Sequence, residues 1–533
     1  MLLAPLLLAL ASATPTPSAL PTLSSSTTPE TARVIVVVGH NGGAPDPRPP
    51  LSFADDDAAR LYLQLAPQAS RAFLLTTFDR ESARLHPDLT AIARPPTTTA
   101  LAQALGEAFW AVREQQQRGK HTELVFAFAG HGDVDDSGRG FVVLADAPFF
   151  RDDLWQQVVE ASPADINHVI VDACASYFFV KSRGGDGTDG VALTPKLLDV
   201  LSGDKQRADL KARTGVFVST SSAAEVHESA ALSAGVFSYL LRSALLGASD
   251  DNGDGDIEYG EAAAFLAAAS ANLDDPRARL QVYAEPPLQR PHAPLARLST
   301  SGSKHFLAID STQPTHVRLK DSRGLPVAEL HSDGRRTRYL ALPAQPFFIV
   351  ERDGRTKNAD SEEAVFVPRS AGATSLQALQ WRPSSSSMTR GAGDAFSSLF
   401  KTPYAPAFVA GYLATTSLPV PRDDVALFTP VWAIDGAPPA RIPVFAIGVG
   451  ASIGAGVAVG GAVTSLVLNQ MAFSQLEQGF VRTGQLDPAL TLEVEGYRNA
   501  TTAFTLGACA LGLVGGGLLA ASFVLDDGTL VLP

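Results

Sequence analysis

The sequence predicts an α/β fold: a mostly parallel sheet flanked by helices, followed by a small all-β module and a C-terminal transmembrane helical hairpin. Three observations predict it. Over residues 32–299, continuous β-branched runs alternate with helical patterns, as expected of a parallel sheet buried on both faces. From about Lys304, short strands separated by Asp/Gly/Ser/Pro turns are typical of a small β-sandwich. Two long uncharged apolar runs follow near the C-terminus.

Composition limits the classes of function. A chain of 533 residues is too long for one core, which predicts several domains. Its formal net charge of -13, without a basic stripe, excludes nucleic acid as an expected partner. The two cysteines, Cys174 and Cys509, lie far apart, so no disulfide framework is expected. Cys509 lies in a Gly/Ala/Leu-rich run and is interpreted as a small buried hydrophobe, which leaves Cys174 for chemistry.

The N-terminus is interpreted as an export signal followed by a spacer. Residues 1–13 form an apolar run ending in Ala-Ser-Ala, the small-residue pattern of a secretory cleavage site, without a basic segment ahead of it. A frayed apolar tail is the alternative. Residues 14–31 are rich in Pro, Ser and Thr and predict a disordered spacer. An export signal places the following domain outside the cytoplasm.

The domain over residues 32–299 is predicted to alternate strands and helices. Strands are predicted at 33–38, 73–75, 123–128, 168–171 and 216–218, and helices at 53–65, 100–117, 152–161 and 235–248. The carboxyl ends of parallel strands meet at one edge of a sheet, where reactive groups gather. His131 and Cys174 each come shortly after one of these strands, so we expect them at the same edge.

His131 and Cys174 are therefore the predicted catalytic pair. A cysteine nucleophile needs a base that forms its thiolate, and N–H donors that stabilise the oxyanion. His131 is the predicted base, and the backbone N–H groups of Gly132 and Cys174 are the predicted oxyanion donors. Gly130 is expected to let the strand turn sharply into the site. His40, at the end of another strand, is interpreted as a rim residue that scaffolds its loop, and lining of the cleft is the alternative. Its Gly-rich loop is not a phosphate-binding loop, because no Lys-Ser/Thr follows.

The segments FAFAGHGD and HVIVDACAS resemble the His-Gly and Asp-x-Cys signatures of caspase-like peptidases, in particular the metacaspase and bacterial caspase-like branch. The resemblance covers about half the chain, roughly 32–299, and includes FADDDAARLYLQL and ESAALSAGVFSYLLRSALLG. It implies a caspase-like fold and cysteine endopeptidase activity, with His131 as general base and Cys174 as the nucleophile that forms a thioacyl intermediate. After the cysteine the family usually has His or Arg, then Ser or Gly, then Gly, whereas this chain has Ala175-Ser176-Tyr177-Phe178.

The resemblance also implies a substrate-binding residue. Asp172 matches the acidic residue that, in metacaspase-like members, lines the pocket for the side chain before the cleaved bond. A carboxylate there selects Arg or Lys through a charge-assisted hydrogen bond, so cleavage after Arg or Lys is expected. The alternative is a strand-end residue that binds loop amides. In the exposed loop 181–194, Arg183 is a candidate self-cleavage site.

Residues 250–261 match the twelve-residue calcium loop of EF hands, with helical patterns on both sides. Gly255 occupies the position of the sharp turn. The predicted metal ligands are Asp250, Asn252, Asp254, Asp256 and Glu261, of which Asp256 contributes its backbone carbonyl. The sequence thus predicts Ca²⁺ with a structural or regulatory role, and a solvated acidic turn is the alternative.

The β module is predicted over residues 300–372. Its strands are expected at 305–310, 316–320, 327–330, 338–342, 347–351 and 365–367. It contains no catalytic constellation, and its expected role is that of a spacer or docking module. A linker over 373–440 precedes the predicted membrane hairpin, 441–533.

The hairpin prediction depends on two apolar runs, 444–468 and 502–525. Each is long enough as a helix to cross ~30 Å of hydrocarbon. Small-xxx-small spacings such as Gly450 and Gly454 favour close packing of transmembrane helices. Two buried helices of a soluble domain are the alternative.

Two functions are compatible with these patterns. The first is a calcium-binding cysteine endopeptidase, anchored at a membrane and acting on protein or peptide substrates. The second is a catalytically silent caspase-like scaffold or interaction protein tethered to the membrane. The presence of both His131 and Cys174 favours the first.

Overall fold

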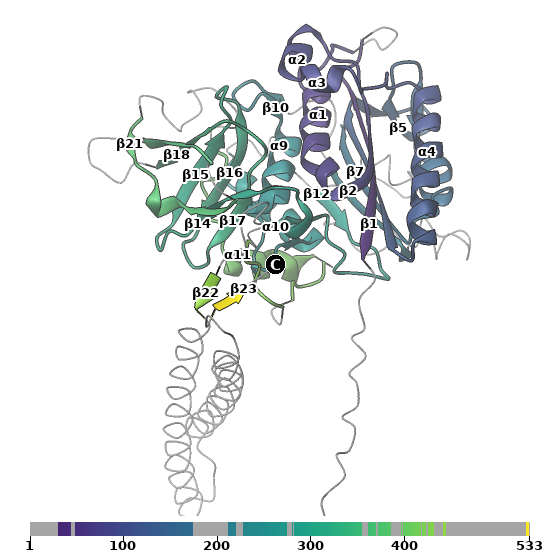
Figure 1. Cartoon of the computed structure of the whole chain (residues 1–533). Helices are drawn as coiled ribbons and strands as arrows, with labels where there is room; N and C mark the ends of the chain where they lie inside the picture. Colours follow the sequence, from purple (N-terminus) through teal and green to yellow (C-terminus); the bar gives the residue numbers. More distant parts are fainter. Residues whose placement is uncertain are drawn as a thin grey trace, which may run out of the picture. The chain divides into compact units, whose positions relative to one another are not determined.

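The structure is a computed structural model, and the chain divides into two compact units, Met1–Ala433 and Ile434–Pro533. In the second unit, β22 (Arg441–Pro443) pairs antiparallel with β23 (Thr529–Val531). All other described helices and strands belong to the first unit (Figure 1). The structure describes residues 30–43, 48–173, 212–219, 228–273, 280, 282–353, 361–368, 371–384, 396, 398–416, 418–422, 425–430, 441–443 and 529–531.

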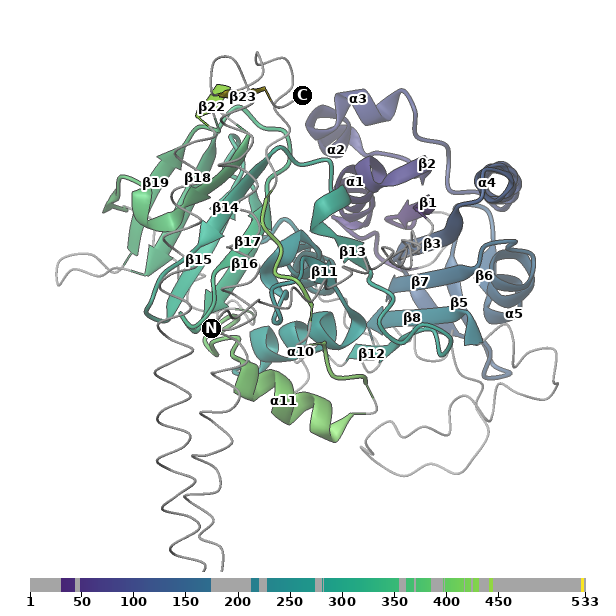
Figure 2. The same cartoon turned by 60° about the horizontal axis from the view of Figure 1, so that its bottom comes forward.

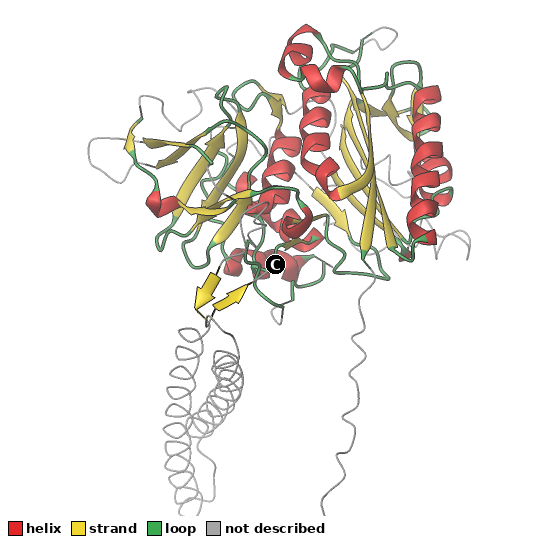
Figure 3. Cartoon of the chain, viewed as in Figure 1, coloured by secondary structure: helices red, strands yellow, loops and turns green. Residues whose placement is uncertain are grey.

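A six-stranded sheet is the centre of the region that carries the predicted catalytic residues (Figures 1 and 3). The strand order is β12-β8-β7-β3-β1-β2, and all neighbours are parallel except β12 and β8. The strands are β1 (Thr31–His40), β2 (Ala69–Leu75), β3 (His121–Gly130), β7 (Ile166–Ala173), β8 (Thr214–Ser219) and β12 (Val282–Glu285). The β-branched and aromatic runs form these strands because both faces of the sheet are covered.

Helices cover the two faces of this sheet. One face packs against α1, α9 and α10, and the other packs against α4 and the π-helical segment η2. Figures 1 and 2 show α1 and α4 on opposite sides of β1. Successive side chains of a strand point to opposite faces of the sheet, so Val37 belongs to the core on the first face and Val36 to the core on the second. The bounds are α1 (Ala54–Leu65), α4 (Thr98–Gln117), η2 (Leu154–Glu160), α9 (Val236–Ser243) and α10 (Tyr259–Ser270).

The β module consists of a three-stranded sheet, β17-β14-β20, and a five-stranded sheet, β16-β15-β18-β19-β21. Leu307 of the first sheet and Val317 of the second belong to the same buried cluster, so the two sheets share a core. The strands are β14 (His305–Ile309), β15 (Thr315–Lys320), β16 (Pro326–Ser332), β17 (Arg338–Ala341), β18 (Phe348–Asp353), β19 (Ser361–Phe366), β20 (Gly372–Ser375) and β21 (Arg382–Pro383).

Short elements connect these layers. A three-stranded meander, β4-β5-β6, follows directly after His131, and the sequence did not predict it. The short elements are η1 (Ala66–Gln68), α2 (Arg80–Leu85), α3 (Pro87–Thr90), β4 (Gly132–Val134), β5 (Gly140–Val143), β6 (Pro148–Phe150), α5 (Arg151–Asp153), β9 (Glu228–Ser229), β10 (Ala234–Gly235), η3 (Ala244–Ala248), β11 (Asp256–Ile257), β13 (Ala296–Arg297), η5 (Leu298–Thr300), η6 (Leu376–Ala378) and α11 (Pro406–Thr415).

The predicted fold class needs a correction in its C-terminal part. Within the described ranges, none of the helices combines the length and the apolar character needed to cross a bilayer. The described fold is therefore a mixed α/β structure with several sheets and without the expected transmembrane hairpin. The two apolar runs behind that expectation, 444–468 and 502–525, lie outside the described residues, as does the expected signal, 1–13. The first strand begins at Thr31, the last residue of the predicted spacer.

Candidate active site

His131 follows β3 directly, at the carboxyl edge of the sheet. The preceding residue, Gly130, pairs with His40 at the end of β1 and with Ala173 at the end of β7, so three strands end side by side. The chain then turns into the β4-β5 hairpin, where the Val143 N–H donates to the His131 carbonyl at 3.0 Å. The His131 side chain is buried, with 4% exposed. The topology therefore fixes the histidine backbone on both sides.

A glycine is required at position 130. Its φ is +156°, and a Cβ there would lie 2.8 Å from the His40 carbonyl oxygen and 2.9 Å from the Phe128 ring. Any larger residue would push β1 and β3 apart at the point where His131 begins. The expectation that Gly130 serves the turn into the site agrees with this geometry.

The His131 ring is held by the loop that follows β1. Its Nε2 lies 3.0 Å from the Pro49 carbonyl oxygen. Because a carbonyl accepts hydrogen bonds and cannot donate them, Nε2 carries the proton of the neutral ring and Nδ1 keeps its lone pair. The same loop contacts the residue after His131, since the Arg48 guanidinium donates to the Gly132 carbonyl at 3.2 Å. Sequence reasoning missed Pro49, because every residue has a carbonyl and no side-chain type signals this role.

Cys174 lies outside the described residues, as do Arg183 and the rest of the loop 181–194. The last described residue before the cysteine is Ala173, which is opposite Gly130 in the parallel register of β3 and β7. The strands that precede the two predicted catalytic residues are thus neighbours and end at the same level. The distance between His131 and Cys174, and the oxyanion roles of Gly132 and Cys174, stay predictions.

Asp172 is near the carboxyl end of β7, opposite Ala129 of β3. Its Oδ2 accepts hydrogen bonds from the Ser238 hydroxyl at 2.5 Å and from the Ser238 N–H at 3.2 Å. Burial raises the pKa of Asp172 to about 6, Ser238 opposes this rise, and the charge of Glu228 adds to it. Among the described residues, no Arg or Lys contributes to the pKa of this carboxyl. At neutral pH the group is a carboxylate with no cationic partner in the described structure.

Asp57, in the first turn of α1, is a second carboxyl group at this site. Its Oδ2 accepts a hydrogen bond from the Gly235 N–H at 2.7 Å. A Cβ on Gly235 would lie 3.0 Å from Asp57 Oδ2 and 3.1 Å from Asp172 Oδ2, so this glycine separates the two carboxyl groups. Burial raises the pKa of Asp57 to about 7; the charges of Arg242 and Arg60 lower it, and that of Asp172 raises it. Arg242 Nη2 is 3.6 Å from Asp57 Oδ1.

The sequence contains a signal for Asp57 that the sequence analysis did not use. Three consecutive aspartates open α1, and all three are buried. Asp55 accepts from the Asp79 N–H at 3.1 Å, and Asp56 pairs with His86 at 3.0 Å. Acidic residues are ordinary at a helix N-terminus because the helix dipole favours them. Only the packing of α9 against α1 distinguishes Asp57 as the residue that faces Asp172.

The two carboxyl groups line a small cavity under the carboxyl edge of the sheet. It has room for about 10 Å³, roughly one water molecule. Its polar lining consists of Asp57, Asp172, Ser238 and Arg242, and its apolar wall includes Phe128. Within the described structure, Asp57 Oδ1 and both Nε and Nη2 of Arg242 are buried without a hydrogen-bond partner. Polar atoms in this condition are usually satisfied by water or by a ligand.

The predicted calcium loop has the backbone of a tight acidic turn. Gly253 and Gly255 both have φ of +80°, a conformation that favours glycine. Asp250 accepts hydrogen bonds from the N–H groups of Gly253 at 2.7 Å and Gly255 at 3.0 Å. Asn252 and Asp254 each accept from the N–H two residues further on. The loop joins η3 to α10, as predicted for a helix-loop-helix unit.

Glu261, the last predicted ligand, is fully buried in the first turn of α10. Its carboxyl accepts from the N–H groups of Asp251 at 2.9 Å and Glu258 at 3.0 Å. Burial raises its pKa well above the usual value, and the nearby Asp250 raises it further. Burial also raises the pKa of Asp250, to about 6. Across the described ranges, no group of three or more His, Cys, Asp or Glu side chains is arranged to hold a metal ion.

Comparisons with known proteins do not identify a family. No protein-family model matches the sequence, and no match was found among curated proteins. One solved structure, protein GSU0716 from Geobacter sulfurreducens, is similar over 36% of this chain and 72% of its own chain, at 13% sequence identity and a TM-score of 0.20. A likeness this weak carries no argument about fold or function. The resemblance to caspase-like peptidases therefore stays a prediction.

Proposed function

We propose that this chain is a cysteine endopeptidase of the caspase-like type, with His131 as general base and Cys174 as nucleophile. The observation that supports it most is the hydrogen bond from His131 Nε2 to the Pro49 carbonyl, at 3.0 Å. It selects the tautomer in which Nδ1 can accept a proton, as a general base requires. The neighbouring strand, β7, ends one residue before Cys174. Nucleophilic catalysis needs a pre-oriented base close to the cysteine, and the pairing of Gly130 with Ala173 supports that proximity.

In the proposed reaction, His131 Nδ1 takes the proton of the Cys174 thiol, and the thiolate sulfur attacks the peptide carbonyl carbon. The N–H groups of Gly132 and Cys174 stabilise the oxyanion that forms. His131 then donates the proton to the leaving amine as the C–N bond breaks, which leaves a thioacyl group on Cys174. Water, deprotonated by His131, attacks the thioester carbon; the carbon–sulfur bond breaks, the peptide leaves as a carboxylic acid, and His131 returns the proton to the Cys174 sulfur. The Pro49 carbonyl stabilises the imidazolium that forms in both steps, because it accepts from Nε2.

Asp57, Asp172 and the one-water cavity that they line, called the acidic pocket, support a substrate with Arg or Lys before the cleaved bond. The cavity is too small for a whole Arg or Lys side chain, so the cationic group is proposed to approach the half-buried Asp172 at the carboxyl edge of the sheet and to displace the water. Two carboxyl groups with raised pKa values, Asp57 and Asp172, face the same cavity, and one guanidinium, that of Arg242, lines it. Burial disfavours the ionised carboxyl forms, and an incoming cation relieves that cost. Asp172 uses one oxygen to accept from Ser238, and within the described structure its other oxygen is available for a substrate guanidinium or ammonium.

The decisive experiment compares fluorogenic peptides with Arg, Lys or Asp before the leaving group. We expect the wild-type chain to cleave the Arg and Lys peptides. Cys174→Ala and His131→Ala should each lower kcat/KM on the order of a thousandfold or more, because base and nucleophile act as a unit. Cys509→Ala is the matched control and should retain full activity. Equal rates for wild type and Cys174→Ala would refute the nucleophile, and a preference for Asp peptides would refute the pocket assignment.

We also propose that residues 250–261 bind Ca²⁺. The support is the combination of the ligand spacing with a positive φ at Gly255, the position of the sharp turn. The buried carboxyl groups of Asp250 and Glu261, with raised pKa values, would be stabilised as anions by a cation. The proposed ligands are Asp250, Asn252, Asp254, Asp256 and Glu261.

Calcium binding is tested by the melting temperature of the chain in a Ca²⁺ titration, with Mg²⁺ as the control ion. We expect the melting temperature to rise with Ca²⁺ concentration, because a ligand that binds the folded state stabilises it. Asp254→Ala should abolish the rise. A melting temperature that does not change up to millimolar Ca²⁺ would contradict the proposal.

A further inference from the structure

Helix α9 lies between the acidic pocket and the β module. Its N-terminal end contacts the pocket, where the Gly235 N–H donates to Asp57 and Ser238 donates to Asp172 through both its N–H and its hydroxyl. Both proposed substrate-binding carboxyl groups thus accept hydrogen bonds from one end of a two-turn helix. A displacement of this helix would change both contacts together.

The other half of α9 is attached to β16 of the β module. The Tyr239 hydroxyl donates to Glu329 Oε2 at 3.1 Å, and the Glu329 N–H donates to the Ser243 hydroxyl at 3.2 Å. Glu329 is fully buried and is held from its own sheet by His316, with Nε2 at 2.7 Å, and by Arg318 at 3.1 Å. Its carboxylate is therefore a rigid anchor for α9 rather than a mobile surface group.

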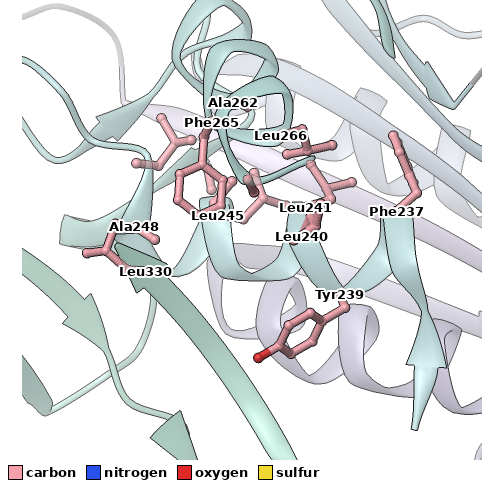
Figure 4. Close-up of a cluster of buried hydrophobic side chains, with 14 of the residues drawn as sticks. Phe237, Tyr239, Leu240, Leu241, Leu245, Ala248, Ala262, Phe265, Leu266 and Leu330 are labelled. Carbon is pink, nitrogen blue, oxygen red and sulfur yellow. The ribbon is translucent and has the colours of Figure 1, made fainter. Parts of the chain in front are cut away.

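The apolar core is also continuous between α9 and the module. Figure 4 shows Leu240, Leu241 and Leu245 with Phe265 of α10 and Leu330 of β16 in one buried cluster. The same cluster extends into both sheets of the module. Two parts that share one close-packed core transmit small displacements to each other, because interiors have few voids.

We infer that Glu329 of the β module is a positioning residue for the acidic pocket and acts through Tyr239 and α9. The module is then part of the substrate-binding apparatus, rather than the spacer or docking module expected from the sequence. This inference rests on the proposed function, since the pocket ligand is taken to be the basic side chain before the cleaved bond. Ser238 and Tyr239 are neighbours on a stiff helix, so a shift at Tyr239 is carried to the Ser238 contacts with Asp172.

The first test measures binding without catalysis. Agmatine, which carries the guanidinium of arginine, is titrated into the full chain by calorimetry, for wild type and Tyr239→Phe. This substitution removes the hydroxyl that donates to Glu329 and keeps the ring in the core. We expect agmatine affinity to fall about threefold to tenfold, as for the loss of one buried hydrogen bond. Glu362→Gln is the matched control, because Glu362 is a buried carboxylate of the same module that pairs with Arg352 rather than with the partners of Glu329; it should leave agmatine affinity unchanged.

A double-mutant cycle separates positioning from loss of stability. Ser238→Ala removes the hydroxyl contact to Asp172. If Tyr239 acts through that contact, Tyr239→Phe should have little further effect on agmatine affinity in the Ser238→Ala background. Additive effects of the two substitutions, or an equal loss of affinity in Glu362→Gln, would overturn the inference.

Peptide cleavage gives a second readout. Tyr239→Phe should raise KM for an Arg peptide by a similar factor while kcat changes less, because the pocket binds the side chain and does not react. A loss confined to kcat would overturn the inference. If the wild-type chain binds agmatine but cleaves no peptide, the proposed peptidase function fails. The double-mutant cycle measured by agmatine affinity then still decides the role of Glu329.

Discussion

Charged side chains lie at both ends of the central sheet, but their interaction partners differ. At the amino end, Glu123 of β3 is fully buried and accepts from Arg33 at 2.7 Å and from Arg297 at 2.9 Å. His168 of β7 lies nearby, with Nε2 at 3.7 Å from the same carboxylate. At the carboxyl end of that strand, Asp172 has a hydroxyl and an N–H as partners but no cation among the described residues.

The pKa values record this difference. Burial alone would raise the pKa of Glu123, but Arg33, His168 and Arg297 hold it well below its usual value. Burial raises the pKa of Asp172 to about 6, and Ser238 compensates only in part. The Glu123 carboxylate at the amino end is thus paired with cations and contributes to stability. The Asp172 carboxylate at the carboxyl end has no cationic partner among the described residues and can bind a cationic ligand. Two carboxylates on adjacent strands, the buried Glu123 and the half-buried Asp172, can therefore have opposite roles, and the presence or absence of cationic partners among the described residues distinguishes them.

Glu123→Gln should produce the largest effect, because it removes the anion at the amino end and leaves Arg33 buried with an uncompensated charge. Arg33 is only 2% exposed. We expect the free energy of unfolding to fall by about 3–5 kcal/mol, the usual result of breaking a buried ion pair. Urea unfolding followed by circular dichroism measures it. A loss below about 1 kcal/mol would remove the distinction between the two ends.

Asp172→Asn should show the reverse pattern. The free energy of unfolding at pH 7 should stay the same or rise slightly, because folding raises the pKa of this carboxyl and so disfavours its ionised form. In contrast, kcat/KM for Arg peptides should fall about a hundredfold, as a desolvated charge-assisted contact is lost. The variant is compared with wild type in the same peptide and denaturation assays. Strong destabilisation with unchanged peptide preference would assign Asp172 a structural role.

The pH dependence should differ in sign between folding and binding. The folded pKa of Asp172, about 6, exceeds the ordinary 3.8, so the folded chain holds this proton where the unfolded chain has lost it. The contribution of Asp172 to stability is therefore fully present below pH 3.8 and is lost as the pH rises through 6. Agmatine needs the ionised form, so its affinity should weaken up to about tenfold per pH unit below about 6. Calorimetry between pH 5 and 8 measures the affinity, and a flat profile would contradict the assignment.

Much of the fold could be predicted from the sequence. The β-branched runs that become β1, β3 and β7 are long, apolar and bounded by turn residues, which leaves few alternatives to buried parallel strands. The edge location of His131 followed from that pattern. The meander β4-β5-β6 was missed because its strands have three or four residues, too few to show a period.

The site contains parts that no local pattern reveals. Asp57 meets Gly235 across 178 positions of the chain, and Glu329 meets Tyr239 across 90. Pro49 contributes only a carbonyl to His131. These contacts form only when α1, α9 and the β module pack around one core. They depend on long-range packing, so residue types in the sequence do not predict them. The sequence alone indicates a spacer role for the β module because its anchor, Glu329, is an ordinary strand residue there.

The smallest expected effect comes from an ion pair outside both ends of the sheet, and it tests whether burial is the cause of the contrast. Arg94 and Glu107 form a bidentate pair at 2.8 and 3.0 Å, as close as the pair of Arg33 with Glu123, but both side chains are substantially exposed. Water already solvates each partner, so Glu107→Gln should change the free energy of unfolding by no more than about 0.5 kcal/mol. Urea unfolding beside Glu123→Gln gives the comparison directly. If both substitutions cost the same, pairing alone would set the stability, and the lack of a cation beside Asp172 among the described residues would no longer indicate a ligand site.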